Sequence, residues 1–397
     1  MNRPGLLAFD PAVPRRDSLL DEQHIGPRLA VLGHGPPDAQ WRVAKVKYNI
    51  GRDLRVVYRR ADDEGDRLIA VRTVPRSGDA RFSRFPTDRR LGWLPALMAP
   101  RDAFASLLDG AWTSSRLAGY APEKSAVVAC VDAARQPIAY AKLFAHAAEA
   151  GGAFEVTRRI ELASRAAKIV LRTPRPILLA EAQNLLITEA ARGRRLTELS
   201  GAELEWSVGL MGRALAELHA MRVPLDAVVH DRTGDAALND AAGVIGRARP
   251  DLADEAAHLA QSLLVSRPTY TRRVPLHGDV HLKNVLLDRE RIWLIDFDQA
   301  HAGPAAADLG SFLAVLRSDA LVGARTAAES VELADAFLRG YALVRPLPPL
   351  AELRWHTSAA LLAERALRAV TRVRRDILAH LPALIADAGR SRERGVA

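Results

Sequence analysis

Short hydrophobic runs bounded by polar turns predict β-hairpins in three parts of the chain. One hairpin joins Ser125–Val131 to Ile138–Phe144, and another joins Val285–Leu287 to Ile292–Ile295. A third is predicted within residues 48–72, where two apolar runs flank an Asp-containing turn. Each run is short and rich in β-branched or aromatic residues, so strands are favoured over buried helices.

The spacing of apolar residues becomes helical after residue 193. Ser200 and Glu203 have the spacing of a capping box, which predicts the start of a long helix that ends near residue 220. Residues 251–264 and 359–388 continue the helical pattern. The chain is therefore predicted to have an α+β fold, with β-structure mainly in its first half and helices mainly in its second.

The length and composition are those of an ordinary globular protein. A chain of 397 residues exceeds the usual size of one hydrophobic core, so two or three structural units are expected. No apolar run approaches the roughly 18 residues of a membrane span, and the N-terminus has no secretory signal pattern. The single cysteine, Cys130, fits a reducing compartment. These features predict a cytoplasmic protein with no membrane partner.

The positive charge does not have the form that nucleic-acid binding needs. The formal net charge is +9, but only six of the 56 basic residues are lysines, and the arginines are spread along the predicted helices. Aromatic residues make up 5% of the chain and do not alternate with basic clusters, so a platform for stacking bases is missing. No nucleic-acid partner is predicted.

The most concentrated group of polar residues is the stretch "HGDVHLKN" at residues 277–284. It precedes the hairpin whose second strand ends at Asp296 and Asp298, so the hairpin is expected to bring these carboxylates back toward Asp279 and Asn284. Carboxylates this close repel one another unless a cation such as Mg²⁺ lies among their oxygens. The order of these residues is that of the catalytic parts of kinases.

Two simpler interpretations of this stretch compete with a kinase loop. His277, Asp279 and His281 could bind zinc, but the other nine histidines do not cluster near a further ligand pair. The stretch could also be an ordinary polar turn. If the stretch is a kinase loop, His281 is expected to pack within it, and Lys283 either contacts the transferred phosphate or is exposed.

The segments "LHGDVHLKNVLLD" and "WLIDFDQAHAGPAAADLGSF" together resemble the aminoglycoside phosphotransferase/choline kinase-like family of small-molecule kinases. The resemblance implies a two-lobed, protein-kinase-like fold that uses ATP and Mg²⁺. It assigns the acceptor hydroxyl to Asp279, and the metal to Asn284 and Asp296 with Asp298 beside them. It also implies that His277 braces the loop. Asp308 would cap the following helix and tie down the segment after Asp296.

The same resemblance implies a nucleotide-binding lobe upstream. Lys142, on the second strand of its hairpin, would hold the α- and β-phosphates of ATP. Its acidic partner is expected on the following helix, at Glu155 or Glu161, with Glu155 preferred. The loop Tyr120–Ser125, which contains Lys124, would face the phosphates. The apolar run that ends at Glu189 would form the hinge that pairs with adenine.

Residues 1–110 are predicted to form a β-rich cap, residues 111–192 the small lobe, and residues 193–397 the large lobe. The cap segment "KYNIGRDLRVVYRRADDEGDRLIAVR" can be aligned with "GYAPEKSAVVACVDAARQPIAYAK" of the small lobe, which suggests a duplicated hairpin. The alternative is that two β-hairpins of this length look alike by chance.

The sequence thus predicts an ATP- and Mg²⁺-dependent phosphotransferase that acts on a hydroxyl group of a small molecule. A sugar or amino sugar is favoured over an aminoglycoside, because polycationic antibiotics require an acidic cleft. The helices of the predicted large lobe instead carry many arginines: Arg365, Arg368, Arg372, Arg374 and Arg375. A second alternative is a pseudokinase that binds a partner without chemistry. Its active-site positions would then be degraded, whereas Lys142, Asp279, Asn284 and Asp296 are all present.

Overall fold

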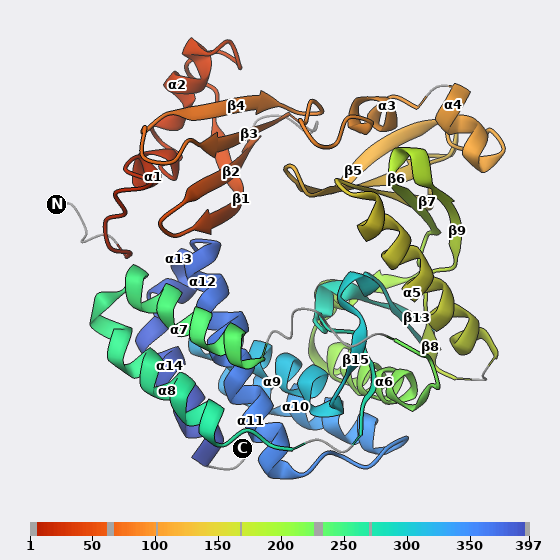
Figure 1. Cartoon of the computed structure of the whole chain (residues 1–397). Coiled ribbons are helices and arrows are strands. Elements are labelled where there is room, and N and C mark those ends of the chain that lie inside the picture. Colours follow the sequence, from red (N-terminus) through yellow and green to blue (C-terminus); the bar gives the residue numbers. More distant parts are fainter. Residues whose placement is uncertain are drawn as a thin grey trace.

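The computed structural model describes residues 6–61, 67–100, 102–166, 169–225, 233–269 and 272–393. Two antiparallel sheets lie in the N-terminal half, and the C-terminal half consists mainly of helices (Figure 1). The predicted α+β class is confirmed. In the described parts of the chain, no helix combines the length and apolar character needed to span a membrane.

The first sheet, here called the cap sheet, has the strand order β1-β2-β3-β4 with every neighbouring pair antiparallel. Its strands are β1 (Trp41–Asn49), β2 (Asp53–Arg60), β3 (Leu68–Thr73) and β4 (Ala80–Arg84). Two short helices precede it, α1 (Arg16–Leu19) and α2 (Ile25–Val31). Apolar residues of these helices and of β1–β3 share one core, because hydrophobic positions on strands and helices face one another there.

The second sheet, here called the small-lobe sheet, has the order β5-β6-β7-β10-β9. Its strands are β5 (Ser114–Ala121), β6 (Ser125–Val131), β7 (Pro137–Phe144), β9 (Pro176–Ala180) and β10 (Leu185–Glu189). Helix α5 (Ala147–Ala166) packs against β7, β9 and β10. Between the two sheets come α3 (Leu94–Met98), α4 (Asp102–Ala105) and the 3₁₀ turn η1 (Ser106–Leu108). The predicted hairpin Ser125–Val131 and Ile138–Phe144 is confirmed.

The large lobe surrounds two small groups of strands. One group joins β11 (Arg194–Arg195), β13 (Val285–Asp288), β14 (Arg291–Leu294) and β8 (Leu171–Arg172), and the other joins β12 (Val274–Leu276) and β15 (His301–Gly303). The helices are α6 (Gly201–Ala220), α7 (Asp235–Ala248), α8 (Ala253–Val265), α9 (Ala305–Leu321), α10 (Ala327–Ala342), α11 (Leu350–Ala360), α12 (Leu367–Thr371), α13 (Arg375–Leu378) and α14 (Leu381–Glu393). A π-helical segment, Leu361–Ala366, connects α11 to α12.

Two local sequence signals, Gly193 and Ser200, lie where the chain passes into the large lobe. Gly193 has φ +100°, and a Cβ atom there would lie 2.0 Å from the carbonyl oxygen of Leu287, so only glycine fits. Ser200 is the N-cap of α6, as predicted, but its side chain makes no capping hydrogen bond. The capping box does not form because the carboxylate of Glu203 pairs with Arg194 instead.

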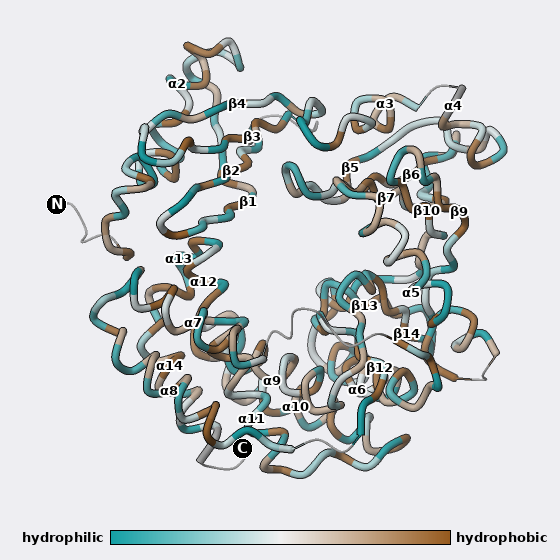
Figure 2. The backbone as a smooth tube through the Cα atoms, viewed as in Figure 1, coloured by the Kyte–Doolittle hydropathy of each residue, from teal (hydrophilic) through white to brown (hydrophobic). Residues whose placement is uncertain are grey.

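The cap sheet packs against both lobes. One of its cores contains residues of α7, α8 and α11–α14, and β1 contacts α12. The other core joins β2 and β3 to the small-lobe sheet, α3 and Trp112. Figure 1 shows this arrangement, with the cap sheet above α12 and α13 and beside β5. In Figure 2, hydrophobic positions are distributed along both sheets and the large-lobe helices, between hydrophilic ones. The division at residue 110 stays a prediction, and the packing of α3 with the small lobe favours a boundary nearer residue 85.

The two hairpins that the sequence aligns lie in separate sheets but have the same pairing register. Tyr48 pairs with Leu54 in the cap sheet, and Tyr120 pairs with Ala126 in the small-lobe sheet. One residue further along, the second strand of each hairpin pairs with the cation of the third strand. In the cap sheet this pair is Arg55 with Arg72, and in the small-lobe sheet it is Val127 with Lys142.

A polar contact repeats as well. The hydroxyl of Tyr48 donates to Asp10 Oδ2 at 2.7 Å, and the same oxygen accepts the N–H of Gly51 at 2.8 Å. In the second copy, Tyr120 donates to Asp88 Oδ2 at 2.8 Å, and that oxygen accepts the N–H of Glu123 at 2.9 Å. Each N–H comes three residues after its tyrosine. A generic hairpin does not require these contacts, so they support the duplication.

Candidate active site

The loop at residues 277–284 connects β12 to β13 and is fixed by a buried carboxylate from α9. Asp308 accepts the backbone N–H groups of His277 at 2.7 Å and Gly278 at 2.9 Å. Gly278 has φ +76°, and a Cβ atom there would lie 2.1 Å from the carbonyl oxygen of Gln299. The His277 ring donates from Nε2 to the carbonyl of Ile295 at 3.0 Å, so it braces the loop against the end of β14.

Asp308 does not cap its helix. Helix α9 starts at Ala305 with Pro304 as N-cap, which leaves Asp308 one turn inside and free to face the loop. His219 of α6 donates from Nε2 to Asp308 at 3.1 Å, and Nδ1 accepts from the hydroxyl of Tyr341 at 2.9 Å. Burial lowers the pKa of His219, which keeps the ring neutral. The predicted capping role is therefore replaced by a buried network that holds the loop.

Asp279 carries its carboxylate at the exposed side of the loop. Its Oδ2 lies 3.3 Å from His281 Nε2, and its Oδ1 lies 3.5 Å from the guanidinium of Arg368 on α12. The N–H of Asp279 donates to His277 Nδ1 at 3.3 Å, so both ring nitrogens of His277 are engaged and neither can bind zinc. In the described residues, no three His, Cys, Asp or Glu side chains form a group able to hold a metal.

The hairpin β13–β14 returns the chain beside this loop, as predicted. The N–H of Ile295 donates to the carbonyl of Asn284 at 3.0 Å, and Asn284 Nδ2 donates to the carbonyl of Asp279 at 3.2 Å. This contact orients the amide and leaves its oxygen as a potential ligand. Asp296 follows β14 in the left-handed conformation, at φ +67°. A non-glycine residue in this conformation is uncommon and often marks a functional position.

Lys142 of β7 joins the two carboxylates that follow β14. Its Nζ lies 2.8 Å from Asp296 Oδ1 and 2.5 Å from Asp298 Oδ2. Burial alone would lower the pKa of Lys142, but attraction by Asp298 and Asp296 raises it, so the ammonium stays charged. Burial raises the pKa of Asp298, although Lys142 opposes this effect. A cation thus already lies between the two carboxylates, and oxygen ligands of this kind suit Mg²⁺.

The predicted partner of Lys142 on α5 is wrong. Glu155 pairs with Arg158 at 3.0 Å and Arg159 at 3.6 Å, on the exposed side of the helix. Glu161 is buried, but no contact joins it to Lys142 among the residues that the structure describes. The acidic partners of Lys142 instead follow the β13–β14 hairpin, with Asp296 154 positions further along the chain.

The two remaining residues predicted to bind the nucleotide, Lys124 and Glu189, lie at the ends of strands of the small-lobe sheet. Lys124 is exposed in the turn between β5 and β6, and its charge opposes the rise that burial causes in the pKa of Asp298. Glu189 ends β10, where its carboxylate accepts the N–H of Arg175 at 3.0 Å. The N–H of Glu189 donates to the carbonyl of Arg175 at 2.9 Å. The Glu189 side chain is therefore held by the neighbouring segment.

Sequence reasoning missed the specific role of Arg368. This residue lies 3.5 Å from Asp279 and 3.5 Å from Glu364, and Glu364 belongs to the π-helical segment before α12. Segments of π-helix are rare and frequently occur at functional sites. The only signal in the sequence was the i,i+4 spacing of Glu364 and Arg368, which is common on ordinary helices.

The sequence model of the phosphotransferase enzyme family matches residues 51–353, which is more than half of the chain. The chain belongs to this family. The predicted family and enzyme class, a phosphotransferase, are thereby confirmed. A comparison with curated proteins finds no match.

Three solved structures illustrate what this phosphotransferase is similar to. A choline/ethanolamine kinase family protein from Mesorhizobium loti is 18% identical, with 75% of this chain and 93% of that chain covered at a TM-score of 0.49. Aminoglycoside phosphotransferase APH(3'')-Id from Streptomyces rimosus is 18% identical, with 68% and 98% covered at 0.47. Amicoumacin kinase hAmiN is 16% identical, with 71% and 89% covered at 0.49.

Proposed function

We propose that this phosphotransferase transfers the γ-phosphate of ATP to a hydroxyl group of a small molecule, a sugar or amino sugar. The observation that carries the proposal is the convergence of Lys142, Asp296 and Asp298 beside a loop that presents Asp279. The proposal is supported by family membership and by the intact set of charged groups. A pseudokinase would not need all of them.

Asp279 is the residue proposed to act on the acceptor. Its carboxylate accepts the hydroxyl proton as the acceptor oxygen bonds to the γ-phosphorus and the bond to the β,γ-bridging oxygen breaks, which releases ADP. Arg368 and His281 contact its two oxygens and fix their orientation. The Asp279 side chain is 23% exposed, so an acceptor can reach it.

Asn284, Asp296 and Asp298 are proposed to hold the metal, and Lys142 the nucleotide phosphates. Mg²⁺, when bound, neutralises charge on the phosphates. The ammonium of Lys142 lies between the carboxylates that would contact the metal. Metal binding therefore requires Lys142 to turn toward the phosphates, and Lys124 in the β5–β6 turn adds a second positive charge on that side.

The charges near Asp279 support a neutral or weakly cationic acceptor. Arg368 contacts Asp279, while Arg365 lies 4.0 Å and Arg325 lies 3.8 Å from Asp319. Asp319 is thus already paired with two arginines, which leaves less of its negative charge for a polycation. Aminoglycosides are therefore the less favoured acceptors.

The test is a screen for ADP release with the full-length protein, ATP and Mg²⁺. Sugars, amino sugars, choline and aminoglycosides are the acceptors. We expect a sugar or amino sugar to stimulate ADP release, and Asp279→Asn to reduce that turnover by about 10²- to 10⁴-fold while ATP still binds. Stimulation by aminoglycosides alone would reassign the acceptor. ATP binding without ADP release for any acceptor would favour the pseudokinase.

A further inference from the structure

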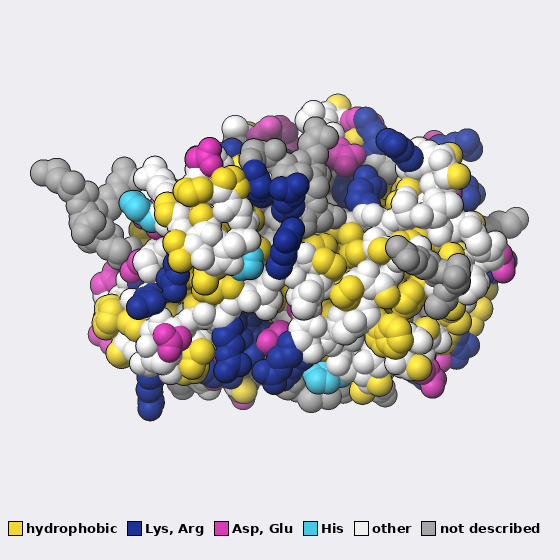
Figure 3. Space-filling view, turned by 90° about the horizontal axis from the view of Figure 1, so that it is seen from above, with side chains coloured by type: hydrophobic (Ala, Val, Ile, Leu, Met, Phe, Trp, Pro, Cys, Tyr) yellow, Lys and Arg dark blue, Asp and Glu magenta, His cyan; other side chains and the backbone are white. Residues whose placement is uncertain are grey.

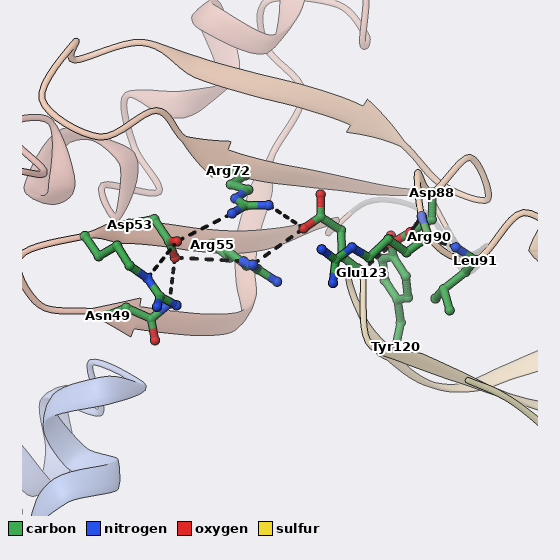
Figure 4. A network of polar contacts seen from close by, with 10 residues as sticks. Asn49, Asp53, Arg55, Arg72, Asp88, Arg90, Leu91, Tyr120 and Glu123 are labelled. Atoms are coloured by element: carbon green, nitrogen blue, oxygen red, sulfur yellow. Dashed lines mark hydrogen bonds and ion pairs between the residues drawn. The ribbon is translucent and has the colours of Figure 1, made fainter. Parts of the chain in front are cut away.

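A basic pocket lies between the cap sheet and the turn that joins β5 to β6. Its volume is about 370 Å³, and its walls include five arginines: Arg55, Arg72, Arg81, Arg89 and Arg90. Tyr120, Pro122 and Glu123 of that turn also line the pocket, although the sequence predicts that the turn faces the phosphates of ATP. The side chains proposed above to bind ATP, metal or acceptor do not line it: Lys124, Lys142, Asp279, Asn284, Asp296 and Asp298. Figure 4 shows part of it, with Arg55 and Arg72 of the cap sheet reaching toward Glu123 of the turn.

The cap sheet carries a row of positive charges across all four strands, and three members of the row line the pocket: Arg55, Arg72 and Arg81. Lys47 pairs with Arg55, Arg55 with Arg72, and Arg72 with Arg81 in the strand register. Like charges placed directly opposite one another destabilise a sheet. A row of four cations is therefore unfavourable for folding alone, and it indicates a surface that receives an anion.

Two carboxylates compensate only the middle of the row. Asp53 lies 3.9 Å from Arg55 and 3.7 Å from Arg72, and Glu123 lies 3.5 Å and 2.6 Å from the same two arginines. The Nε of Arg55 is buried and has no hydrogen-bond acceptor among the described residues. Its nearest carboxylate oxygen, Asp53 Oδ1 at 3.9 Å, is within ion-pair distance but too far for a hydrogen bond.

The cations at the two ends of the row, Lys47 and Arg81, and Arg89 nearby are not neutralised by a carboxylate of the described residues. Within the described residues, no carboxylate is in ion-pair contact with Lys47, Arg81 or Arg89. Burial lowers the pKa of Lys47, and repulsion from Arg55 lowers it further. Arg81 and Arg89 are exposed, so their guanidinium groups are available to a ligand. In Figure 3, Lys and Arg side chains form several separate groups across the upper face of the molecule.

We propose that this pocket binds a small anion that carries a phosphoryl group. Guanidinium groups donate two parallel hydrogen bonds to phosphate oxygens, and arginine suits this geometry better than lysine. The pocket offers such groups from two facing walls, with Arg55 and Arg81 on one side and Arg89 on the other. Its volume accommodates a pyrophosphate or a small phosphomonoester.

The ligand would also reach the β5–β6 turn. Glu123 holds Arg72 and Arg55 in the absence of another anion, and a phosphoryl group in the pocket competes for the same guanidinium groups. Occupancy therefore releases Glu123, which is adjacent to Lys124. An anion in this pocket is expected to alter nucleotide affinity without touching the nucleotide.

Binding is tested by isothermal titration calorimetry of the full-length protein at low salt. The probes are inorganic phosphate, inorganic pyrophosphate, glucose 6-phosphate and ADP. The variants are Arg81→Gln/Arg89→Gln, Lys142→Met, and Arg42→Gln as the matched control, because Arg42 is an exposed edge-strand arginine of the same sheet outside the pocket. Phosphate and pyrophosphate test for binding of a free inorganic anion, and glucose 6-phosphate tests for binding of a phosphomonoester. ADP measures binding at the nucleotide site.

We expect Arg81→Gln/Arg89→Gln to weaken pyrophosphate binding by about tenfold or more, because two charge-assisted contacts are lost. Arg42→Gln and Lys142→Met should leave it within about twofold. Thermal unfolding separates binding from structure: pyrophosphate should raise the Tm of the wild type and not that of the double variant. Unchanged pyrophosphate binding in the double variant, its loss in Lys142→Met, or no binding of any phosphoryl probe besides ADP would overturn the proposal.

Discussion

The cap sheet and the small-lobe sheet are built alike, yet they place their cations in different surroundings. Each has a tyrosine on its first strand that donates to a buried aspartate, and each presents a cation at the equivalent position of its third strand. In the cap sheet that cation is Arg72, which contacts Asp53 and Glu123. In the small-lobe sheet it is Lys142, which contacts Asp296 and Asp298 at the end of the β13–β14 hairpin.

The element that comes after each hairpin explains this difference. After β3 the chain turns into β4, which pairs with β3 and completes the cap sheet. After β7 it enters α5 and returns through β10, which pairs with β7 and leads into the large lobe. The same hairpin therefore closes a sheet in one copy and joins two lobes in the other. Arg72 and Lys142 have equivalent strand positions, so the difference in their contacts comes from the elements that surround them.

The largest effect should come from removing the two equivalent cations, one at a time. Lys142→Ala is expected to reduce phosphoryl transfer by about 10²- to 10³-fold with the fold intact, because it removes a charge placed against the phosphates. Arg72→Ala should leave the KM for ATP within a few fold. Steady-state kinetics of both variants against ATP, with circular dichroism as the folding control, compares them. An essential Arg72 and a dispensable Lys142 would place the nucleotide on the cap sheet.

A Mg²⁺ titration of activity compares the surroundings of the two cations again, with a smaller expected effect. Asn284→Ala and Asp296→Ala each remove one oxygen ligand, so each should raise the Mg²⁺ concentration for half-maximal activity by about tenfold or more. Asp53→Asn is the matched control, since Asp53 contacts the cation of the other sheet and should not change the Mg²⁺ requirement. If all three variants need the same Mg²⁺ concentration as the wild type, the metal is held elsewhere.

Local patterns in the sequence predicted the hairpins and the loop that presents Asp279. These elements depend on short apolar runs and on turns between neighbours, which the sequence records directly. The pairing of Lys142 with Asp296 and Asp298 links segments far apart in the chain, and the sequence does not record it. The expected partner, Glu155, was a misinterpretation of a local signal. Arginines three and four residues after it already predict local pairing on a helix.

Asp308 and Arg368 illustrate two further limits. Asp308 stands near the start of α9, where an acidic residue commonly serves the helix terminus. Its actual role follows from α6 and the loop meeting at one buried point, which needs the tertiary fold. Arg368, which contacts Asp279, follows a π-helical segment that precedes α12. The sequence gives no sign of that segment.

The smallest effects concern the repeated tyrosines. Tyr48→Phe and Tyr120→Phe each remove a hydrogen bond to a buried carboxylate, Asp10 or Asp88. Each should lower the free energy of unfolding by about 1–3 kcal/mol, because the carboxylate loses a partner that water does not replace. Urea unfolding measures this loss. Tyr58→Phe is the control, since its hydroxyl donates to the backbone carbonyl of Leu19 and no carboxylate is involved.

The kinetic effects of the two variants should differ. Both should lose stability, with the larger loss for Tyr48→Phe, because the Tyr48 hydroxyl also accepts a hydrogen bond from Arg16 at 3.3 Å. Asp88 also holds the N–H of Glu123 in the β5–β6 turn, so Tyr120→Phe loosens the turn that carries Lys124 and should raise the KM for ATP a few fold. Asp10 holds the N–H of Gly51, in a turn without any proposed site residue, so Tyr48→Phe should leave that KM unchanged. A negligible stability loss in either variant would argue against equivalent copies, whereas equal changes in KM would mean that the cap turn also serves the nucleotide.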